Sequence, residues 1–269
     1  MSDAPSLLID PLRVHALLGE ASGRFDIAAV AECSSTNTVL MRRAAAGAPS
    51  GTVLAADRQT AGRGSRGRAW SASPETGLTF SVLWAFPGEL ARLSGLSLAV
   101  GVAVARALAR CGVDGVMLKW PNDILYGDAK LGGILIELGA DGELARAVIG
   151  IGINLRLPEN IGEAGIGALP PTALAQIVAA PPGRNVLLAK LLIELAEVFD
   201  RFAAHGFAGL REAWQARHAW QERPVRLLRD GHVEQEGVCA GADADGALLL
   251  RTADGLKRCL SGDVSLRPR

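Results

Sequence analysis

The segment 59–70 constrains the fold of this chain more than any other part of it. It reads Gln-Thr-Ala-Gly-Arg-Gly-Ser-Arg-Gly-Arg-Ala-Trp, so three glycines are interspersed with three arginines, and apolar strand-like runs flank it at 51–56 and 77–86. Glycine lets a ligand approach backbone N–H groups closely. Arginine offers a planar fork of donors to phosphate and carboxylate. A cationic loop held between two strands is typical of an anion-binding cradle inside a folded domain.

Runs of glycine and arginine also occur in disordered RNA-binding tails. Those tails are long and lack buried strands on either side, whereas this run is short and its flanks are apolar. The context therefore favours a ligand-binding loop. The loop matches neither the Walker A motif nor the GxGxxG spacing of dinucleotide-binding proteins, so it does not identify its ligand.

The charge balance argues against nucleic acid as the main partner. The chain has 269 residues, with 28 basic and 28 acidic side chains and a net charge of zero. Duplex-binding proteins usually carry a basic surplus. The cysteines at 33, 111, 239 and 259 are far apart and lack metal-ligand spacing, which predicts reduced thiols rather than a zinc site. No secretion signal opens the chain, and the longest uncharged run, 93–105, predicts a buried helix rather than a membrane span. We expect a soluble cytoplasmic protein.

The distribution of patterns predicts two domains. Helical patterns at 90–110, 186–204 and 207–220 alternate with strand-like runs, including a hairpin over 131–153, which indicates an α+β domain at 1–222. From residue 224 the pattern changes to short strands separated by Asp-Gly turns. That pattern predicts a small β-barrel at 223–269, docked on the larger domain because so few residues bury little core.

Four further motifs join the loop 59–70. They are Ser-Thr-Asn at 35–37, Lys-Trp-Pro-Asn-Asp at 119–123, Lys-Leu-Gly-Gly-Ile-Leu-Ile-Glu at 130–137 and Gly-Ile-Gly-Ile-Asn at 150–154. In this order and spacing the set resembles the biotin–protein ligases, and the likeness extends from about residue 32 to residue 267. The resemblance implies a mixed sheet packed with helices, as in class II synthetases, followed by a small SH3-like barrel.

The resemblance also implies a two-step reaction. Biotin and Mg²⁺-ATP would give biotinyl-5′-adenylate, and a lysine of a biotin carboxyl carrier domain would then accept the biotin. The first step joins two anions, so cations and backbone N–H groups must offset their repulsion. The second step needs a positioned amine and a site from which water is excluded.

By resemblance, three groups of residues would share this work. The catalytic group would be Lys130, Arg63 and Asp123, with Lys130 bridging the biotin carboxylate and the α-phosphate. Biotin would be bound by Ser35, Thr36, Asn37, Gln59, Gly62, Arg63, Gly64, Ser65 and Lys130. The adenylate would be bound by Arg66, Arg68, Trp70, Lys119, Asn122 and Asn154, and Mg²⁺ would be held by the substrate phosphates with Asn122 or Asp123.

Simpler interpretations exist for several of these residues. Ser35, Thr36 and Asn37 are also of residue types that cap the start of a helix, here the helix that follows them. Asn122 and Asp123 follow a proline, where such side chains often bond their own backbone. Trp70 could equally serve as a core or hinge residue.

The chain also departs from the family pattern in two places. Ser65 stands where an arginine is common in the family. One phosphate contact is therefore missing unless Arg66 or Arg68 replaces it. The segment 156–173 lacks the aromatic residue that some members place over the adenine.

Three rival hypotheses stay open at this point. Bifunctional members carry an N-terminal helix-turn-helix domain, but too few residues precede Ser35 for one, so we expect no operator binding. Lipoate ligases share the fold, but their Arg-Arg-x-Ser-Gly-Gly-Gly signature is absent. A non-catalytic biotin- or protein-binding module of the same fold would have no need of Lys130 or Arg63. The sequence does not distinguish a monomer from a homodimer.

Overall fold

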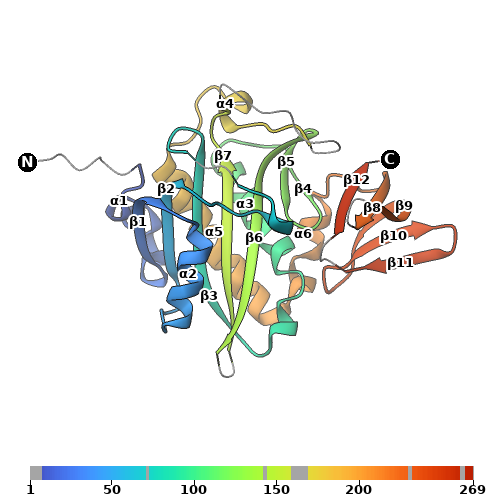
Figure 1. Ribbon diagram of the computed structural model, residues 1–269, viewed down its shortest axis with the longest axis horizontal. Helices are drawn as coiled ribbons and strands as arrows, with labels where there is room; N and C mark the ends of the chain where they lie inside the picture. Colours follow the sequence, from blue (N-terminus) through green and yellow to red (C-terminus); the bar gives the residue numbers. More distant parts are fainter. Residues whose placement is uncertain are drawn as a thin grey trace, which may run out of the picture.

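The computed structural model describes residues 8–70, 73–141, 144–158, 169–229, 232–260 and 264–268. Its larger part is built on a seven-stranded mixed sheet with the order β1-β2-β3-β7-β6-β5-β4 (Figure 1). The strands are β1 (Asp26–Cys33), β2 (Thr52–Gln59), β3 (Gly77–Pro87), β4 (Val116–Lys119), β5 (Asp123–Tyr126), β6 (Ala129–Asp141) and β7 (Leu144–Asn154).

The predicted hairpin forms the middle of this sheet. β6 and β7 pair antiparallel from Gly132 to Asp141, and β7 also pairs with β3. Their register places Gly133 opposite Gly152 and Leu135 opposite Gly150. The two strands at the other edge, β1 and β2, are parallel, with helix α2 (Thr36–Ala45) as their crossover. Helix α2 begins just after the edge strand β1 and packs across β2, β3 and β7, so its first turn lies over the centre of the sheet.

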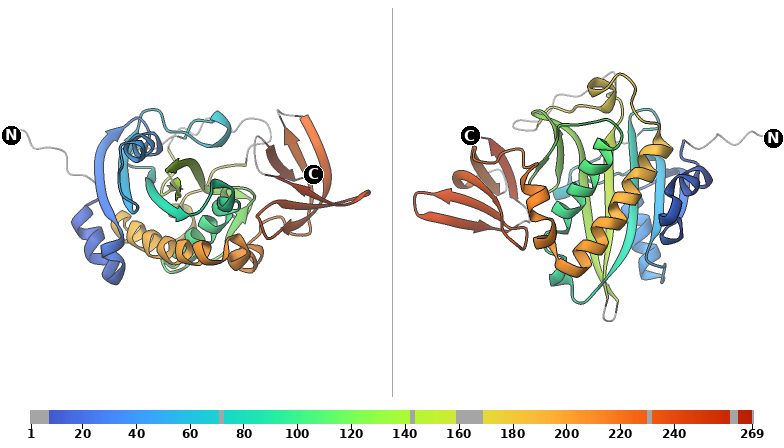
Figure 2. Two further views of the ribbon diagram at one scale, coloured as in Figure 1. Left: turned by 90° about the horizontal axis from the view of Figure 1, so that it is seen from below. Right: turned by 180° about the vertical axis from the view of Figure 1, so that it is seen from behind.

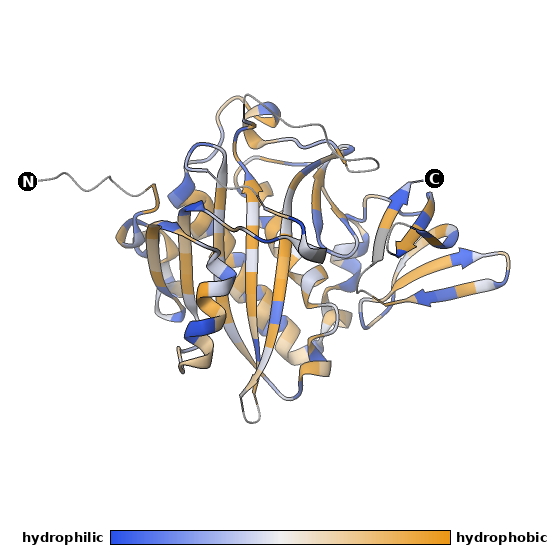
Figure 3. Ribbon diagram, in the orientation of Figure 1, coloured by the Kyte–Doolittle hydropathy of each residue, from blue (hydrophilic) through white to orange (hydrophobic). Residues whose placement is uncertain are grey.

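Helices cover both faces of the sheet. Helix α2 lies on the face seen in Figure 1, and the long helices α3 (Leu96–Ala109) and α5 (Arg184–His205) lie on the opposite face (Figure 2). The central strands and these two helices are largely hydrophobic (Figure 3), and α3 is buried over most of its length. The remaining helices are α1 (Pro11–Leu18), η1 (Gly19–Arg24), η2 (Ser65–Gly67), α4 (Leu174–Ile177), η4 (Phe207–Leu210) and α6 (Arg211–Gln215). The α+β class and the helix-covered mixed sheet are thus confirmed.

The single helix predicted at 90–110 is wrong at its start. A short 3-10 turn, η3 (Leu90–Leu93), ends before α3 begins, and Gly95 between them has a φ of 77°. A Cβ at Gly95 would lie 2.6 Å from the Cβ of Phe207, so this position favours glycine in both conformation and space. The stretch Leu90–Ala109 is long and apolar enough for a membrane span by composition, but most of it is buried in the protein core.

The prediction of one helix over 207–220 is also wrong. The chain makes η4 and α6 and then continues in turns. This irregular segment runs alongside the edge strand β4. There Leu118 N donates to Arg217 O, and Ala219 N donates to Leu118 O. Tertiary hydrogen bonds to a sheet edge have replaced the local helical ones.

The C-terminal residues form a second, antiparallel sheet with the order β11-β10-β9-β8-β12. Its strands are β8 (Pro224–Arg229), β9 (His232–Ala242), β10 (Leu248–Thr252), β11 (Gly255–Cys259) and β12 (Val264–Pro268). Across the described strands the pairings leave β11 and β12 at opposite ends, so the sheet is confirmed while its closure into a barrel stays a prediction. It docks on the larger part partly through Trp120, whose indole nitrogen donates to Gly246 O at 3.1 Å.

Candidate active site

A cavity of about 300 Å³ opens on the sheet face that carries α2. It is lined by the start of α2, the end of β2, the glycine–arginine loop (60–70), strands β3, β6 and β7, and part of the segment after β7. The residues predicted for the site that line this cavity are Ser35, Thr36, Asn37, Gln59, Arg63, Gly64, Ser65, Arg68, Trp70, Asn122, Lys130 and Asn154. Segments separated by more than 100 positions in the sequence thus meet in one place.

The first turn of α2 supplies one polar end of the cavity. Ser35 is the N-cap of the helix, and its hydroxyl accepts from Thr38 N at 3.5 Å. Ser35, Thr36 and Asn37 are all buried as residues yet line the cavity. The capping interpretation and the ligand interpretation therefore describe the same side chains, because the cap holds the helix start at the cavity wall.

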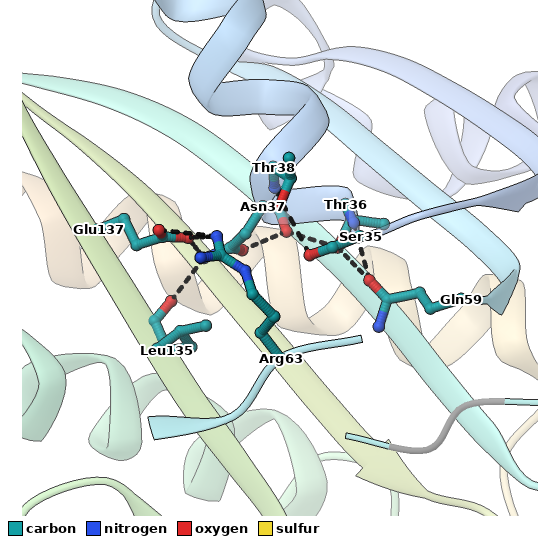
Figure 4. Close-up of polar contacts among 9 residues, drawn as sticks. Ser35, Thr36, Asn37, Thr38, Gln59, Arg63, Leu135 and Glu137 are labelled. Carbon is teal, nitrogen blue, oxygen red and sulfur yellow. Dashed lines mark hydrogen bonds and ion pairs between the residues drawn. The ribbon is translucent and has the colours of Figure 1, made fainter. Parts of the chain in front are cut away.

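A buried hydrogen-bond network fixes these side chains (Figure 4). Gln59 Oε1 accepts from Thr36 N at 2.7 Å and from Thr36 Oγ1 at 3.2 Å. The Ser81 hydroxyl lies 2.7 Å from Thr36 Oγ1 and 2.6 Å from Asn37 Oδ1. Sequence reasoning missed Ser81, although a serine in the largely apolar run of β3 is a usable signal, because a serine buried there needs hydrogen-bond partners.

Asn37 and Arg63 meet at Glu137, a further residue that the sequence did not single out as part of the site. Asn37 Nδ2 donates to Glu137 Oε2 at 3.0 Å and to Leu135 O at 3.2 Å. One terminal guanidinium nitrogen of Arg63 lies 2.7 Å from Glu137 Oε1 and 2.6 Å from Oε2. Figure 4 shows Asn37 from the helix start and Arg63 from the loop reaching towards this carboxylate. The first arginine of the loop is thus engaged by the protein's own anion.

Backbone contacts hold the two ends of the glycine–arginine loop. At its start, Thr60 N and Ala61 N donate to Cys33 O and Ser34 O. At its end, Trp70 N donates to Gly62 O at 2.9 Å. A Cβ on Gly62 would lie 2.2 Å from Trp70 O, so this closure requires glycine. Gly62 is therefore buried beneath the loop, where it holds the loop closed.

Trp70 packs flat against the centre of the sheet. A Cβ on Gly152 would lie 2.3 Å from its ring, and its indole nitrogen donates to Thr79 Oγ1 at 3.4 Å. Trp70 therefore anchors the end of the loop and lines the cavity at the same time, which combines the two roles considered for it. Within the loop, Arg68 donates to the Ser65 hydroxyl at 3.2 Å, while the Arg66 side chain lies outside the described residues.

The opposite end of the cavity carries a compact charge cluster. Asp123 accepts from Lys119 Nζ at 2.6 Å on one oxygen and from Lys130 Nζ at 2.5 Å on the other. Lys119 and Asp123 are buried, whereas the Lys130 side chain is 25% exposed. Burial disfavours the charge on Asp123, but the two ammonium groups outweigh it and hold the pKa of that carboxyl below its usual range. Burial lowers the pKa of Lys119, and Asp123 opposes that change.

The predicted catalytic and Mg²⁺-holding roles of Asp123 stay predictions, and this cluster shows what its carboxylate contacts. Both of its oxygens contact lysines, so in this structure it is a counter-ion that aims Lys130 at the cavity rather than a group exposed to a metal. Lys119 lies behind Asp123 and, unlike Lys130, is absent from the cavity lining. Among the described residues no group of three or more His, Cys, Asp or Glu side chains is arranged to hold a metal ion.

Two asparagines shape the wall near Lys130. Asn122 Nδ2 donates to Ile134 O at 2.8 Å, and Asn154 Nδ2 donates to Thr172 O at 3.0 Å and Lys130 O at 3.3 Å. Asn154 therefore ties the segment after β7 to the base of Lys130. Most of the segment 156–173, which lacks an aromatic residue to cover the adenine, lies outside the described residues, at 159–168.

One cation of the C-terminal sheet, Arg267, interacts electrostatically with residues of the larger part. Burial lowers the pKa of Arg267 in β12, the charge of Arg68 lowers it further, and Asp123 opposes both. Arg267 therefore lies within electrostatic range of both the loop and the lysine cluster. Its position near the chain end, far from every motif, explains why sequence reasoning did not include it in the site.

Comparisons with known proteins agree with this geometry. The model of the biotin/lipoate A/B protein ligase family matches residues 30–154, and that of the biotin protein ligase C-terminal domain matches 222–267. The bifunctional ligase/repressor BirA of Escherichia coli is 36% identical over 263 residues, covering 96% of this chain and 79% of BirA. The biotin–[acetyl-CoA-carboxylase] ligase of Mycobacterium tuberculosis is 33% identical, covering 92% and 91%. The Aquifex aeolicus biotin protein ligase, solved with biotin and ATP, superimposes with a TM-score of 0.78 at 32% identity, covering 91% and 99%.

Proposed function

This chain belongs to the biotin protein ligases of the biotin/lipoate A/B protein ligase family, and from that membership we propose that it activates biotin with ATP and transfers it to a carrier lysine. One observation carries the proposal. A single cavity holds uncharged hydrogen-bonding groups at the start of α2 and an ammonium group, Lys130, on the strand that forms its other wall. A ligand with a neutral polar head and an anionic tail matches that distribution.

The α2 end suits the ureido head of biotin. Ser35, Thr36, Asn37 and Gln59 present hydroxyl and amide groups whose orientations are set by the network around Ser81. Preorganised groups of this kind lose little freedom on binding and gain specificity. Leu135 and Trp70 add apolar lining between the two ends, where the hydrocarbon part of biotin would pack.

Lys130 suits the reacting end. In the first step a biotin carboxylate oxygen attacks the α-phosphorus of ATP, and pyrophosphate leaves. Negative charge is concentrated where the two anions meet, and a partly dry ammonium group stabilises it more than water does. In the second step the uncharged amine of the carrier lysine attacks the acyl carbon of the adenylate, AMP leaves, and the amine releases one proton. Lys130 is held for this work by Asp123 and by the backbone ties of its own residue to 170–172.

Magnesium would enter with the triphosphate of ATP, neutralising it. Mg²⁺ prefers oxygen ligands and keeps several waters. Near Lys130 the side-chain oxygen of Asn122 would suit Mg²⁺, because the side-chain nitrogen of Asn122 donates to Ile134 O. Both carboxylate oxygens of Asp123 already accept from lysines. The protein would therefore contribute one oxygen, with phosphates and water supplying the rest.

The proposed acceptor is the biotin carboxyl carrier domain of a biotin-dependent carboxylase. We place the reaction in the cytoplasm and assign no DNA or membrane partner. A monomer and a homodimer are both compatible with the site, because every residue invoked here comes from one chain.

The test is ATP–pyrophosphate exchange with purified protein. We expect exchange with biotin, no exchange with lipoate, and transfer of labelled biotin to a carrier domain whose acceptor lysine is intact but not to its Lys→Arg variant. Exchange with lipoate alone would assign the chain to the other branch of the family. Absence of exchange with both acids, despite measurable biotin binding, would support a non-catalytic binding module instead.

A further inference from the structure

The carboxylate of Glu137 connects two parts of the site that have different functions. It accepts from Asn37 Nδ2, in the fixed network at the start of α2, and from Arg63 on the glycine–arginine loop. Of these two partners of Glu137, Asn37 is buried, whereas the Arg63 side chain is 47% exposed. One side chain therefore joins a preformed wall of the cavity to its loop.

The position of Glu137 on β6 determines where Arg63 is held. Side chains alternate along a strand, so Gly133, Leu135 and Glu137 face the same side of the sheet, and Gly133 and Leu135 line the cavity. Lys130 and Glu137 are seven positions apart, which separates their Cα atoms by roughly 23 Å at about 3.3 Å per residue. In this structure Arg63 is therefore bound towards the end of β6 away from Lys130.

We propose that Glu137 is a positioning residue that acts as a stand-in anion for Arg63, and that the substrate's own negative charge takes over this arginine during catalysis. This rests on the proposed function, because biotin and ATP supply the competing carboxylate and phosphates. In the ligand-free protein Glu137 holds the loop against the cavity wall. The same carboxylate also keeps the Asn37 amide oriented for the neutral head of the substrate.

The exposure of the Arg63–Glu137 pair makes the exchange feasible. Ion pairs in contact with water contribute little net stability, so a second anion can displace one partner without a large barrier. A buried pair would resist such exchange, because breaking it leaves an uncompensated charge. The contact of Glu137 with Asn37 is different. Removing the Glu137 acceptor leaves the buried Asn37 amide without a partner and without water in its place, which is costly.

Two substitutions at Glu137 separate these roles. Glu137→Gln keeps an oxygen for Asn37 but removes the charge that holds Arg63. We expect tryptic cleavage after Arg63, followed by mass spectrometry on ligand-free protein, to be faster by about 2–5-fold, which is the size of an exposed ion pair. The KM for biotin in the exchange assay should change by less than about twofold. Glu137→Ala should show the same faster cleavage and also raise the KM for biotin by about tenfold, with a smaller change in kcat.

The exchange of partners predicts a further pattern. With saturating biotin and ATP, the substrates replace Glu137 as the partner of Arg63, so wild type and Glu137→Gln should be cleaved at the same rate. A persisting difference would show that Glu137 retains Arg63 in the liganded protein and would overturn the exchange. Equal cleavage of the two ligand-free proteins would overturn the tether itself. An unchanged KM for biotin in Glu137→Ala would overturn the positioning of Asn37.

The matched control is Glu234→Gln. Glu234 pairs with Arg229 on the C-terminal sheet at 3.2 Å with similar exposure, so its loss removes one exposed ion pair without touching the cavity. It should match wild type in every assay. Because the ligand-free cleavage needs no activity, it tests the tether even if the exchange assay rejects the proposed ligase function.

Discussion

The cavity has two charged clusters, and they differ in how the protein holds them. The cluster of Lys119, Asp123 and Lys130 sits on the sheet, with two of its members almost fully buried. The pair of Arg63 and Glu137 joins a loop to a strand, with both side chains in contact with water. The first cluster is part of the folded core and the second is a contact at its surface.

This difference in burial predicts a difference in function. Buried charges depend on their partners, because each would otherwise stay desolvated without compensation. Such a cluster keeps one geometry whether or not a ligand is present. Exposed charges can exchange protein partners for ligand at small cost. We therefore interpret the lysine cluster as the preorganised part of the site and the Arg63–Glu137 pair as its exchangeable part.

The strongest test of this comparison is the stability of matched neutral variants. Asp123→Asn should lower the free energy of unfolding by about 3–5 kcal/mol, because it leaves the buried Lys119 without a counter-ion. Glu137→Gln, the same chemical change in the exposed pair, should cost less than about 1 kcal/mol. Urea unfolding at pH 7 measures both. Similar losses in the two variants would contradict the distinction between the clusters.

The next effect concerns adenylate formation. Lys130→Ala should slow the first step by about 2–4 kcal/mol of barrier, roughly a hundredfold or more, because its charge acts where negative charge accumulates. Its effect on biotin affinity should be much smaller. Single-turnover adenylation and equilibrium binding of biotin separate the two. Adenylation near the wild-type rate would remove Lys130 from the chemistry.

A buried histidine beside β4 predicts that the free energy of unfolding depends on pH. His218 stacks on Trp214, is 3% exposed, and burial lowers its pKa to about 4. The unfolded chain binds a proton at this histidine near pH 6.5, whereas the folded chain does not until about pH 4. The free energy of unfolding should therefore fall as the pH drops through this window, by up to about 3 kcal/mol.

The variant His218→Phe isolates this contribution, because it keeps an aromatic ring against Trp214 and cannot titrate. Urea unfolding of wild type and variant at pH 7 and pH 4.5 gives the comparison. The wild type should lose more stability than the variant between these pH values. Parallel losses would mean that His218 is already protonated in the folded protein or is exposed in it.

Local pattern predicted much of this fold, and the errors share a cause. The hairpin of β6 and β7 was predictable because its strands are continuous apolar runs separated by a polar turn. The helix predicted at 90–110 failed at Gly95, where the decisive contact is with Phe207, more than 100 positions away. Sequence patterns report local preference, and long-range packing overrides it where backbone approaches side chain.

The site shows the same limit. The motifs identified Arg63, Lys130 and the residues at the start of α2, because unusual residue types cluster there. They did not identify Glu137 as the partner of Arg63, because nothing in a strand sequence says which loop will lie above it. They placed Asp123 in the catalytic group and gave it, or Asn122, a part in holding Mg²⁺, but its two lysine contacts emerge only from the pairing of β4, β5 and β6.

The smallest predicted effect concerns Ser65. Its hydroxyl accepts from Arg68, so a positive charge already lies beside the position where related enzymes commonly carry arginine. Ser65→Arg should therefore slow release of the adenylate by less than about tenfold, and Ser65→Ala should speed it by about 2–10-fold through loss of one hydrogen bond. Adenylate dissociation and labelling of an unrelated protein such as an albumin measure this. A much larger gain from arginine would show that Arg68 does not compensate.

The floor of the cavity is defined by two absent side chains. A Cβ on Gly150 would lie 2.2 Å from Asn37 Oδ1, and one on Gly152 would lie 2.3 Å from the Trp70 ring. Asn37 and Trp70 occupy the space in which these side chains would lie, so neither position has room for even a methyl group. Adaptation to a larger or smaller acid, by natural drift or by directed evolution, would therefore have to proceed through the wall at Leu135, while the depth of the cavity stays invariant.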